Sequence, residues 1–146
     1  GTYAIDEIKD IPKKIPQGFI INTAPSYAKD GDPETTFHWQ AVYIGPDSVE
    51  FYDSYGDEPD NLLVKQLKEV IHSWKLPILL KFKVDKVAGQ KPSTDTCGYF
   101  AMRFLDERFN GVSFEQASRF KRPDNYDVDH EEEEGEKTIK REFSLI

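Results

Sequence analysis

Apolar and polar positions follow a helical period in one part of the chain and alternate in several others. Residues 61–74 place apolar side chains at spacings of three and four, which predicts an amphipathic helix that starts at Pro59 or Asp60 and is ended by Pro77. The apolar face of this helix consists of Leu63, Leu67, Val70, Ile71 and Trp74. It is the clearest helix in the sequence.

Short runs rich in β-branched and aromatic residues predict the strands of a sheet. Residues 18–23 and 37–45 are each bounded by turn-forming residues. Gly45-Pro46-Asp47 then turns the chain back along residues 49–53, so the second and third runs should pair as an antiparallel hairpin. Residues 78–87 predict a further strand, whose lysines favour a position near the edge of the sheet.

The stretch 90–104 contains Cys97, the only cysteine of the chain, followed directly by Gly98. An apolar helical pattern begins here and should end at Asn110-Gly111. Cys97 is therefore expected in the first turn of a buried helix, where free N–H groups and the helix dipole favour a thiolate over a thiol of ordinary pKa, about 8.5. The alternative role is that of a small buried side chain.

Composition limits the classes of protein to consider. The chain has 146 residues, 38% of them hydrophobic, which suits one domain with one core. We expect residues 1–123 to form this domain, ending in a short helix after Ser113, and residues 124–146 to form an acidic C-terminal extension. The net charge of −8 argues against general affinity for nucleic acid or anionic membranes. A single cysteine excludes an internal disulfide framework, and we see no bilayer-spanning run and no secretory signal.

A cysteine nucleophile needs a base within hydrogen-bond reach and a group that orients the base. His72 lies off the apolar stripe of its helix and is expected at the surface, and His130 lies in an acidic run that would keep it protonated. His38 remains, at the opening of a strand. The predicted hairpin brings Asp53 back beside His38, which makes Asp53 the candidate orienting acid, although a structural role is the commoner one for each of these residues.

Acyl transfer also requires donors for the developing oxyanion. Gln90 can offer its side-chain amide, and the backbone N–H of Cys97 can offer a second donor if a helix starts there. Gln90 would carry no meaning in isolation.

Taken in order, these residues resemble the adenovirus-type cysteine proteases, the adenain family, which are related to the proteases that remove SUMO and ubiquitin-like modifiers. The matching pieces are Phe37-His38-Trp39, Tyr52-Asp53-Ser54-Tyr55-Gly56, and Gln90 followed by Cys97-Gly98; the run 19–24, ending in Asn-Thr-Ala, matches as well. The resemblance spans residues 18–110. It implies an α+β fold with a central mixed or antiparallel sheet packed against helices, papain-like chemistry, and the nucleophile at the N-terminus of a buried helix.

The resemblance also implies a role for each residue. Cys97 would attack the peptide, His38 would act as base and then acid, Asp53 would hold the imidazole, and Gln90 would help to form the oxyanion hole. Trp39 would flank a narrow substrate cleft that favours glycine-containing sequences, and Gly98 would leave room for the substrate backbone. Filling a core is an equally good role for Trp39.

The sequence departs from the family at four points. The acid is Asp53, as in the deconjugating relatives, whereas the adenovirus enzymes have Glu. No second cysteine exists for a disulfide-linked activating peptide, and the acidic charge disfavours the DNA cofactor that adenain uses. Only 49 residues follow Cys97, so the C-terminal part is shorter or replaced. We therefore expect no cofactor, a protein or peptide substrate such as a capsid precursor, an activating peptide as a further partner, and no membrane.

Three functions follow from this interpretation. The first is a viral maturation protease located inside the host cell, in nucleus or cytoplasm, and in the virion, and not secreted. The second is a deconjugating protease for a ubiquitin-like modifier, and the third is a non-catalytic binding domain on the same fold. No metal site is expected, because the faint calcium-loop pattern at Asp127 and Asp129 has Glu132 where the loop needs glycine.

Overall fold

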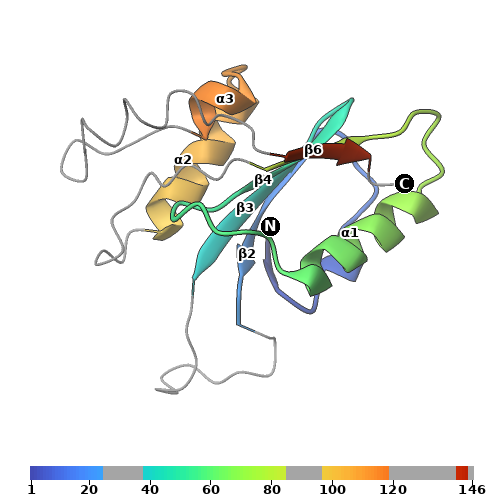
Figure 1. Cartoon of the computed structure of the whole chain (residues 1–146), viewed down its shortest axis with the longest axis horizontal. Helices are drawn as coiled ribbons and strands as arrows, with labels where there is room; N and C mark the ends of the chain where they lie inside the picture. The colour runs from blue at the N-terminus through green and yellow to red at the C-terminus, as the bar shows by residue number, and fades with distance from the viewer. Residues whose placement is uncertain (25–37, 85–96, 119–140, 145–146) are drawn as a thin grey trace.

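The computed structural model describes residues 1–24, 38–84, 97–118 and 141–144, which form a mixed β-sheet with helices on both faces (Figure 1). The fold is therefore α+β, as the sequence predicts. Its strands are β1 (Thr2–Ala4), β2 (Gln17–Asn22), β3 (Trp39–Ile44), β4 (Ser48–Tyr52), β5 (Lys81–Val84) and β6 (Arg141–Ser144). Its helices are the 3-10 turn η1 (Ile8–Asp10), α1 (Asn61–Ser73), α2 (Cys97–Phe109) and α3 (Phe114–Ala117).

Within the described residues the six strands lie in sequence order, β1-β2-β3-β4-β5-β6. The pairs β2–β3, β3–β4 and β5–β6 are antiparallel, whereas β1–β2 and β4–β5 are parallel. The parallel step from β4 to β5 crosses over through α1, because parallel neighbours cannot be joined by a tight turn. The sheet is therefore mixed, and β5 lies one strand in from its edge.

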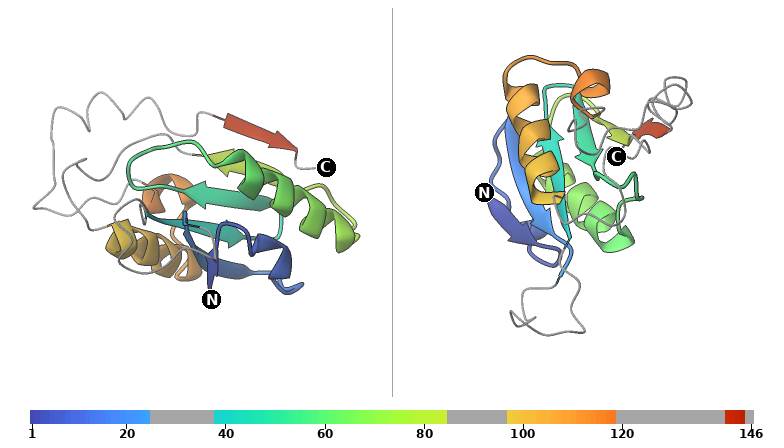
Figure 2. Two further views of the ribbon diagram at one scale, coloured as in Figure 1. Left: turned by 90° about the horizontal axis from the view of Figure 1, so that it is seen from below. Right: turned by 90° about the vertical axis from the view of Figure 1, so that its left-hand side faces the viewer.

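Alternation along β3 and β4 divides the core between the two faces of the sheet. Val42 and Phe51 belong to the apolar cluster under η1 and α1, whereas Ala41 and Tyr52 belong to the cluster under α2 and α3. Figure 2 shows α1 and α2 on opposite sides of the sheet. The sheet is therefore buried on both faces, which explains why every residue of β4 is buried.

Helix α1 forms where the apolar period predicts it. The carboxylate of Asp60 caps it by accepting from the backbone N–H of Leu62 at 2.8 Å. Leu63, Leu67 and Ile71 are fully buried against the sheet, at 0% exposure each. The helix ends at Ser73, and Lys75 takes a positive φ of 53° just beyond it, before Pro77.

Helix α2 packs closely on β2 and β3. A Cβ on Gly18 would lie 2.8 Å from Cδ2 of Leu105 and 2.9 Å from Cε2 of Phe109, so any larger residue would require these side chains to shift. The helix starts at Cys97 and ends before Gly111, at φ 86°, in agreement with the sequence prediction. The hydroxyl of Ser113 then caps α3 through the backbone N–H of Gln116.

A buried ion pair fixes α2 to the sheet. Arg108 donates from Nε to Oε1 of Glu50 at 2.6 Å and from Nη2 to Oε2 at 2.9 Å. Glu50 is only 2% exposed in its side chain, and it accepts a further bond from Ser48. The hydrogen bond with Glu50, more than its charge, raises the pKa of Arg108 above its usual value, and desolvation opposes this only in part.

Three elements are absent from the sequence prediction. Strand β1 and turn η1 form within residues 1–17, where no regular element was expected, and β6 forms within the segment assigned to the acidic extension. Residues 124–140 of the predicted extension fall outside the described residues. Among the described residues, no helix combines the length and the apolar character that crossing a bilayer requires.

Candidate active site

His38 lies immediately before β3 and is fixed by backbone contacts with the end of β2. Its backbone N–H donates to Oγ1 of Thr23 at 3.2 Å, and its carbonyl accepts from the N–H of Thr23 at 3.0 Å. These contacts continue the β2–β3 register, in which Asn22 faces Trp39, by one residue. The histidine is thus held by a rigid sheet and not by a free loop, which suits a catalytic base.

Asp53 follows β4 directly, and its carboxylate contacts His38. The distance between Nε2 of His38 and Oδ2 of Asp53 is 2.7 Å. Continuing the β3–β4 register places residue 53 opposite Gln40, one diagonal step from His38. The hairpin therefore brings together the two residues that the sequence analysis expected to meet.

Three donors converge on the carboxylate of Asp53, which is 0% exposed. Oδ2 accepts from Nε2 of His38 and from the side-chain amide of Gln40, each at 2.7 Å, and Oδ1 accepts from the backbone N–H of Tyr55 at 2.7 Å. A buried carboxylate requires such compensation, because burial without partners is costly.

The contact with Asp53 indicates which ring nitrogen of His38 carries the proton in the neutral imidazole. A carboxylate ion can only accept hydrogen bonds, so the neutral imidazole carries its proton on Nε2 and its lone pair on Nδ1. The side chain of His38 is 13% exposed, so little solvent reaches the ring. Tyr55 stacks on the same ring with centroids 4.7 Å apart and planes inclined by 17°. The ring is therefore fixed in plane and in tautomer.

The N-terminus of α2 packs near Trp39, the first residue of β3. Trp39 is the residue after His38, and its Cδ1 and Cγ lie 3.5 and 3.9 Å from the position of a Cβ on Gly98. Gly98 is in turn the residue after Cys97, the first residue of α2. The strand that follows His38 and the helix that starts at Cys97 are thus in contact through the residues next to these two. The side chain of Cys97 lies outside the described part of the structure.

The remaining predicted site residues are described to different extents. Trp39 is half-buried beside α2, and Gly98 is partly exposed. His72 is exposed on α1, which confirms that it is a surface residue. Gln90 lies outside the described residues, and so do His130 and the acidic run at 127–132.

Two contributors were missed by sequence reasoning. Gln40 and Tyr55 both bind Asp53, and the sequence offers only a weak signal for them. Gln40 lies two positions after His38 on a strand, hence on the same face, and a polar residue there interrupts an otherwise apolar run. That interruption could have identified Gln40.

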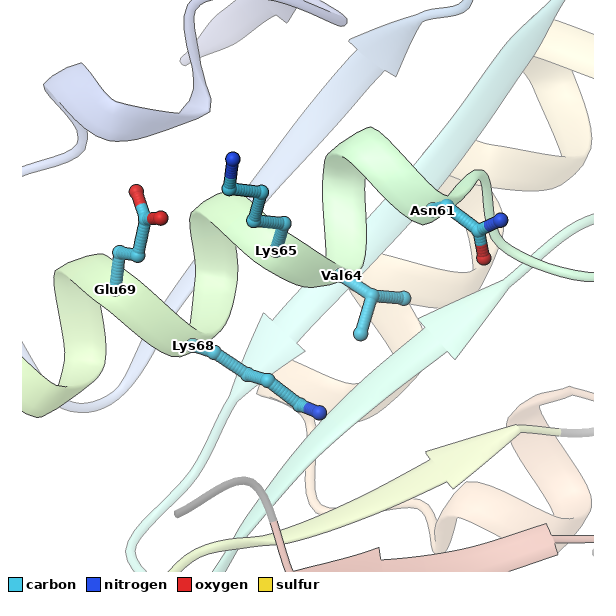
Figure 3. A pocket seen from close by; sticks show the side chains of 5 residues that line it. All are labelled: Asn61, Val64, Lys65, Lys68 and Glu69. Carbon is cyan, nitrogen blue, oxygen red and sulfur yellow. The ribbon is translucent and has the colours of Figure 1, made fainter.

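A hollow of about 380 Å³ opens beside His38. It is lined by Ile5, Thr23, His38, Gln40, Tyr55, Asp57, Glu58 and Asp60. A second hollow, of about 440 Å³, lies on α1 and is lined by Asn61, Val64, Lys65, Lys68 and Glu69 (Figure 3). The first hollow is lined by His38 and Gln40 of the candidate site, whereas the second is lined by residues of α1 alone.

His38, Asp53 and Asp57 also form a potential metal-binding group. One ligand atom from each lies within 4.8 Å of the others, and Asp57 is exposed. However, Nε2 of His38 and Oδ2 of Asp53 are only 2.7 Å apart, a hydrogen-bond distance. Zinc bound between them would need about 2.0–2.2 Å to each atom, at a tetrahedral angle, and so a wider separation. The geometry fits a shared proton better than a shared metal ion.

We compared the chain with protein-family models, with curated proteins and with solved structures, and none of the three comparisons gave a match.

Proposed function

We propose that this protein is a cysteine endopeptidase of the adenain type. Cys97 is the nucleophile, His38 the general base and later the general acid, and Asp53 the residue that holds the imidazole. Gln90 and the backbone N–H of Cys97 stabilise the oxyanion. The observation that carries this proposal is the 2.7 Å contact between Nε2 of His38 and Oδ2 of Asp53. Trp39, the residue after His38, packs against Gly98 at the start of the cysteine-bearing helix.

The chemistry follows from the order in which protons move. Nδ1 of His38 takes the proton of the Cys97 thiol, and the thiolate attacks the carbonyl carbon of the scissile peptide. Asp53 stabilises the imidazolium without itself taking the proton. The imidazolium then protonates the leaving amine, and water, deprotonated by the same imidazole, hydrolyses the thioester.

The proposed substrate is a viral capsid or core precursor, cut after small, glycine-containing sequences. A ubiquitin-like deconjugating protease would use the same active-site chemistry, so the site does not separate the two. The separating experiment is a peptide-library cleavage profile run beside activity-based reagents built on ubiquitin-like modifiers. Cleavage of short glycine-containing peptides alone supports maturation protease activity, whereas reaction only with the folded modifiers supports deconjugation.

The test of the chemistry is substitution of the proposed residues. Cys97→Ala should abolish hydrolysis, because nucleophile loss typically costs on the order of 10⁶-fold in kcat. Asp53→Asn should slow it by roughly 10²- to 10⁴-fold, because the acid orients the base but does not attack. His72→Ala is the matched control, since His72 is exposed on α1, and it should retain full activity. Hydrolysis that survives in Cys97→Ala would end the proposal.

A metal-binding role for His38, Asp53 and Asp57 is the second candidate, favoured by the proximity of their ligand atoms. The two candidates differ in their response to chelation. A thiol protease should keep its kcat/KM in excess EDTA, whereas a metal-dependent activity should be lost and then restored by added Zn²⁺. Asp57→Asn should leave the protease reaction unchanged and should weaken metal binding, which calorimetry measures directly.

A further inference from the structure

Gln40 is a buried amide in direct contact with the acid of the proposed triad. We infer that Gln40 is a positioning residue, which fixes the carboxylate of Asp53 and through it the tautomer of His38. This inference rests on the proposed function for its effect on turnover. Its effect on the imidazole can be measured independently of any hydrolysis.

The contact geometry supports a positioning role. Nε2 of Gln40 and Nε2 of His38 both lie 2.7 Å from the same oxygen, Oδ2 of Asp53. The other oxygen is held at 2.7 Å by the backbone N–H of Tyr55. Rotation of the carboxylate would break all three bonds at once. Because Gln40 is only 5% exposed, water does not readily replace its amide if the side chain is shortened.

The orientation of the amide follows from its partner. A flipped amide would direct its oxygen at a carboxylate oxygen, which is repulsive, so Nε2 must face Asp53. Oε1 then has no hydrogen-bond partner among the described residues. An unpaired buried acceptor destabilises a protein, so folding stability alone does not favour a glutamine here. The donor that Gln40 supplies to Asp53 offsets this cost and gives the residue a role in the site.

The consequence for His38 concerns its two neutral tautomers. A carboxylate fixed with Oδ2 toward the ring selects the tautomer protonated on Nε2, which leaves Nδ1 as the base. Without Gln40, the carboxylate keeps only the bonds from His38 and from the backbone N–H of Tyr55, so its position against the ring is less tightly fixed. The imidazole then samples both tautomers, and the base nitrogen is available for only part of the time.

The chain provides a matched control in Gln66. Gln66 is a second buried glutamine, 7% exposed, whose Nε2 donates to the carbonyl of Ile5 at 2.7 Å. It lies on α1, and its hydrogen bonds are to the backbones of Ile5, Lys9 and Leu62, not to the triad residues that the structure describes. Gln66→Leu therefore removes the three hydrogen bonds of a comparably buried amide and keeps a comparable volume, without touching Asp53.

The direct experiment is a long-range ¹H–¹⁵N spectrum of the imidazoles, recorded at a pH where they are neutral. The samples are Cys97→Ala protein alone and with Gln40→Leu or Gln66→Leu added. His38 should show distinct shifts for a protonated Nε2 and a bare Nδ1 in the first and third samples. With Gln40→Leu, its two nitrogen shifts should converge toward the averaged values of a free imidazole, while the exposed His72 is unchanged.

The kinetic counterpart uses the same two substitutions in protein that retains Cys97. Gln40→Leu should lower kcat by about 10- to 100-fold, the equivalent of one hydrogen bond to a charged group, with KM changed less than about twofold. Gln66→Leu should leave both constants near their original values. A KM effect without a kcat effect would contradict positioning and indicate a binding role.

The outcomes separate this inference from the proposed function. If Gln40→Leu leaves the His38 spectrum unchanged, as Gln66→Leu should, Gln40 only fills space and the inference is overturned. If the spectrum changes but no protein hydrolyses peptides, Gln40 does position the imidazole and the protease proposal is the one that fails. If the spectrum and kcat change together, both stand.

Discussion

Asp53 shows how a single buried carboxylate can define the candidate site. It is fully enclosed at the end of β4, yet three donors, two of them from β3 and its approach, satisfy its oxygens. The sequence predicted its meeting with His38, because an antiparallel hairpin with a short turn has a fixed register. It did not predict Gln40 or Tyr55 as partners. Which polar side chains share a buried acceptor depends on rotamers, and no sequence pattern specifies those.

Gly98 can be tested as a point of substrate approach. A Cβ there would lie 3.5 Å from Trp39, an ordinary contact, so Gly98→Ala should fold normally. Replacing a helical glycine should even stabilise the protein by about 0.5–1 kcal/mol. If the substrate backbone passes over this residue, kcat/KM should fall on the order of 10²-fold, because small misplacements of substrate are costly. Urea unfolding and peptide hydrolysis, measured on the same sample, check both expectations. Full activity would mean that the substrate runs elsewhere.

At the scale of elements, hydrophobic period was a good guide wherever the run was long enough. Residues 61–74 and the run from Cys97 to Asn110 were predicted within a residue or so of α1 and α2. The three-residue elements β1 and η1 are too short for a period to show, and β1 exists because it pairs with β2. Elements made by tertiary pairing are not encoded in local pattern.

The ion pair between α2 and β4 gives a prediction about stability. Arg108→Leu should lower the free energy of unfolding by about 3 kcal/mol, because it leaves Glu50 buried and unpaired. Glu50→Gln added to Arg108→Leu should recover part of that loss, which a double-mutant cycle in urea would measure. Arg103→Leu, on the same helix but with a side chain 40% exposed, is the control and should change stability by less than about 1 kcal/mol.

The same pair should be insensitive to pH across the ordinary range. Because the pKa of Arg108 is raised in the folded protein, its stabilising contribution is fully present below its ordinary value. That contribution is lost only as pH rises through the raised pKa, which happens in strongly alkaline solution. A stability profile from neutral to mildly alkaline pH should therefore show no transition that Arg108→Leu removes.

At the scale of the whole molecule, the sheet connects segments that are far apart in the chain. Its two outer strands, β1 and β6, come from opposite ends of the described sequence, and strands β2 to β5 lie between them. From the sequence alone, the terminal Phe143-Ser144-Leu145-Ile146 could be a docking tail or could pack on the sheet. The structure pairs it with β5, with Phe143 opposite Phe82. Composition does not predict this strand, because the short apolar run follows a strongly acidic segment.

Removal of residues 141–146 tests the contribution of β6. The variant should lose about 2–4 kcal/mol of stability, because the hydrogen bonds between β5 and β6 are lost and each contributes about 0.5–1.5 kcal/mol net. It should also aggregate, because β5 becomes an exposed edge. Urea unfolding and light scattering measure the two effects. A variant lacking only residues 145–146 keeps the strand and should behave as the intact chain does.

The short turn between β3 and β4 has a consequence for how this protein tolerates change. Side chains alternate between the two faces of a strand, so inserting one residue at Gly45-Pro46-Asp47 could shift every position of β4 by one step against β3. The carboxylate would then lie on the wrong side of the sheet, facing α2 instead of Gln40. This turn is therefore as sensitive to insertion as the site itself, although it lies at the other end of the hairpin.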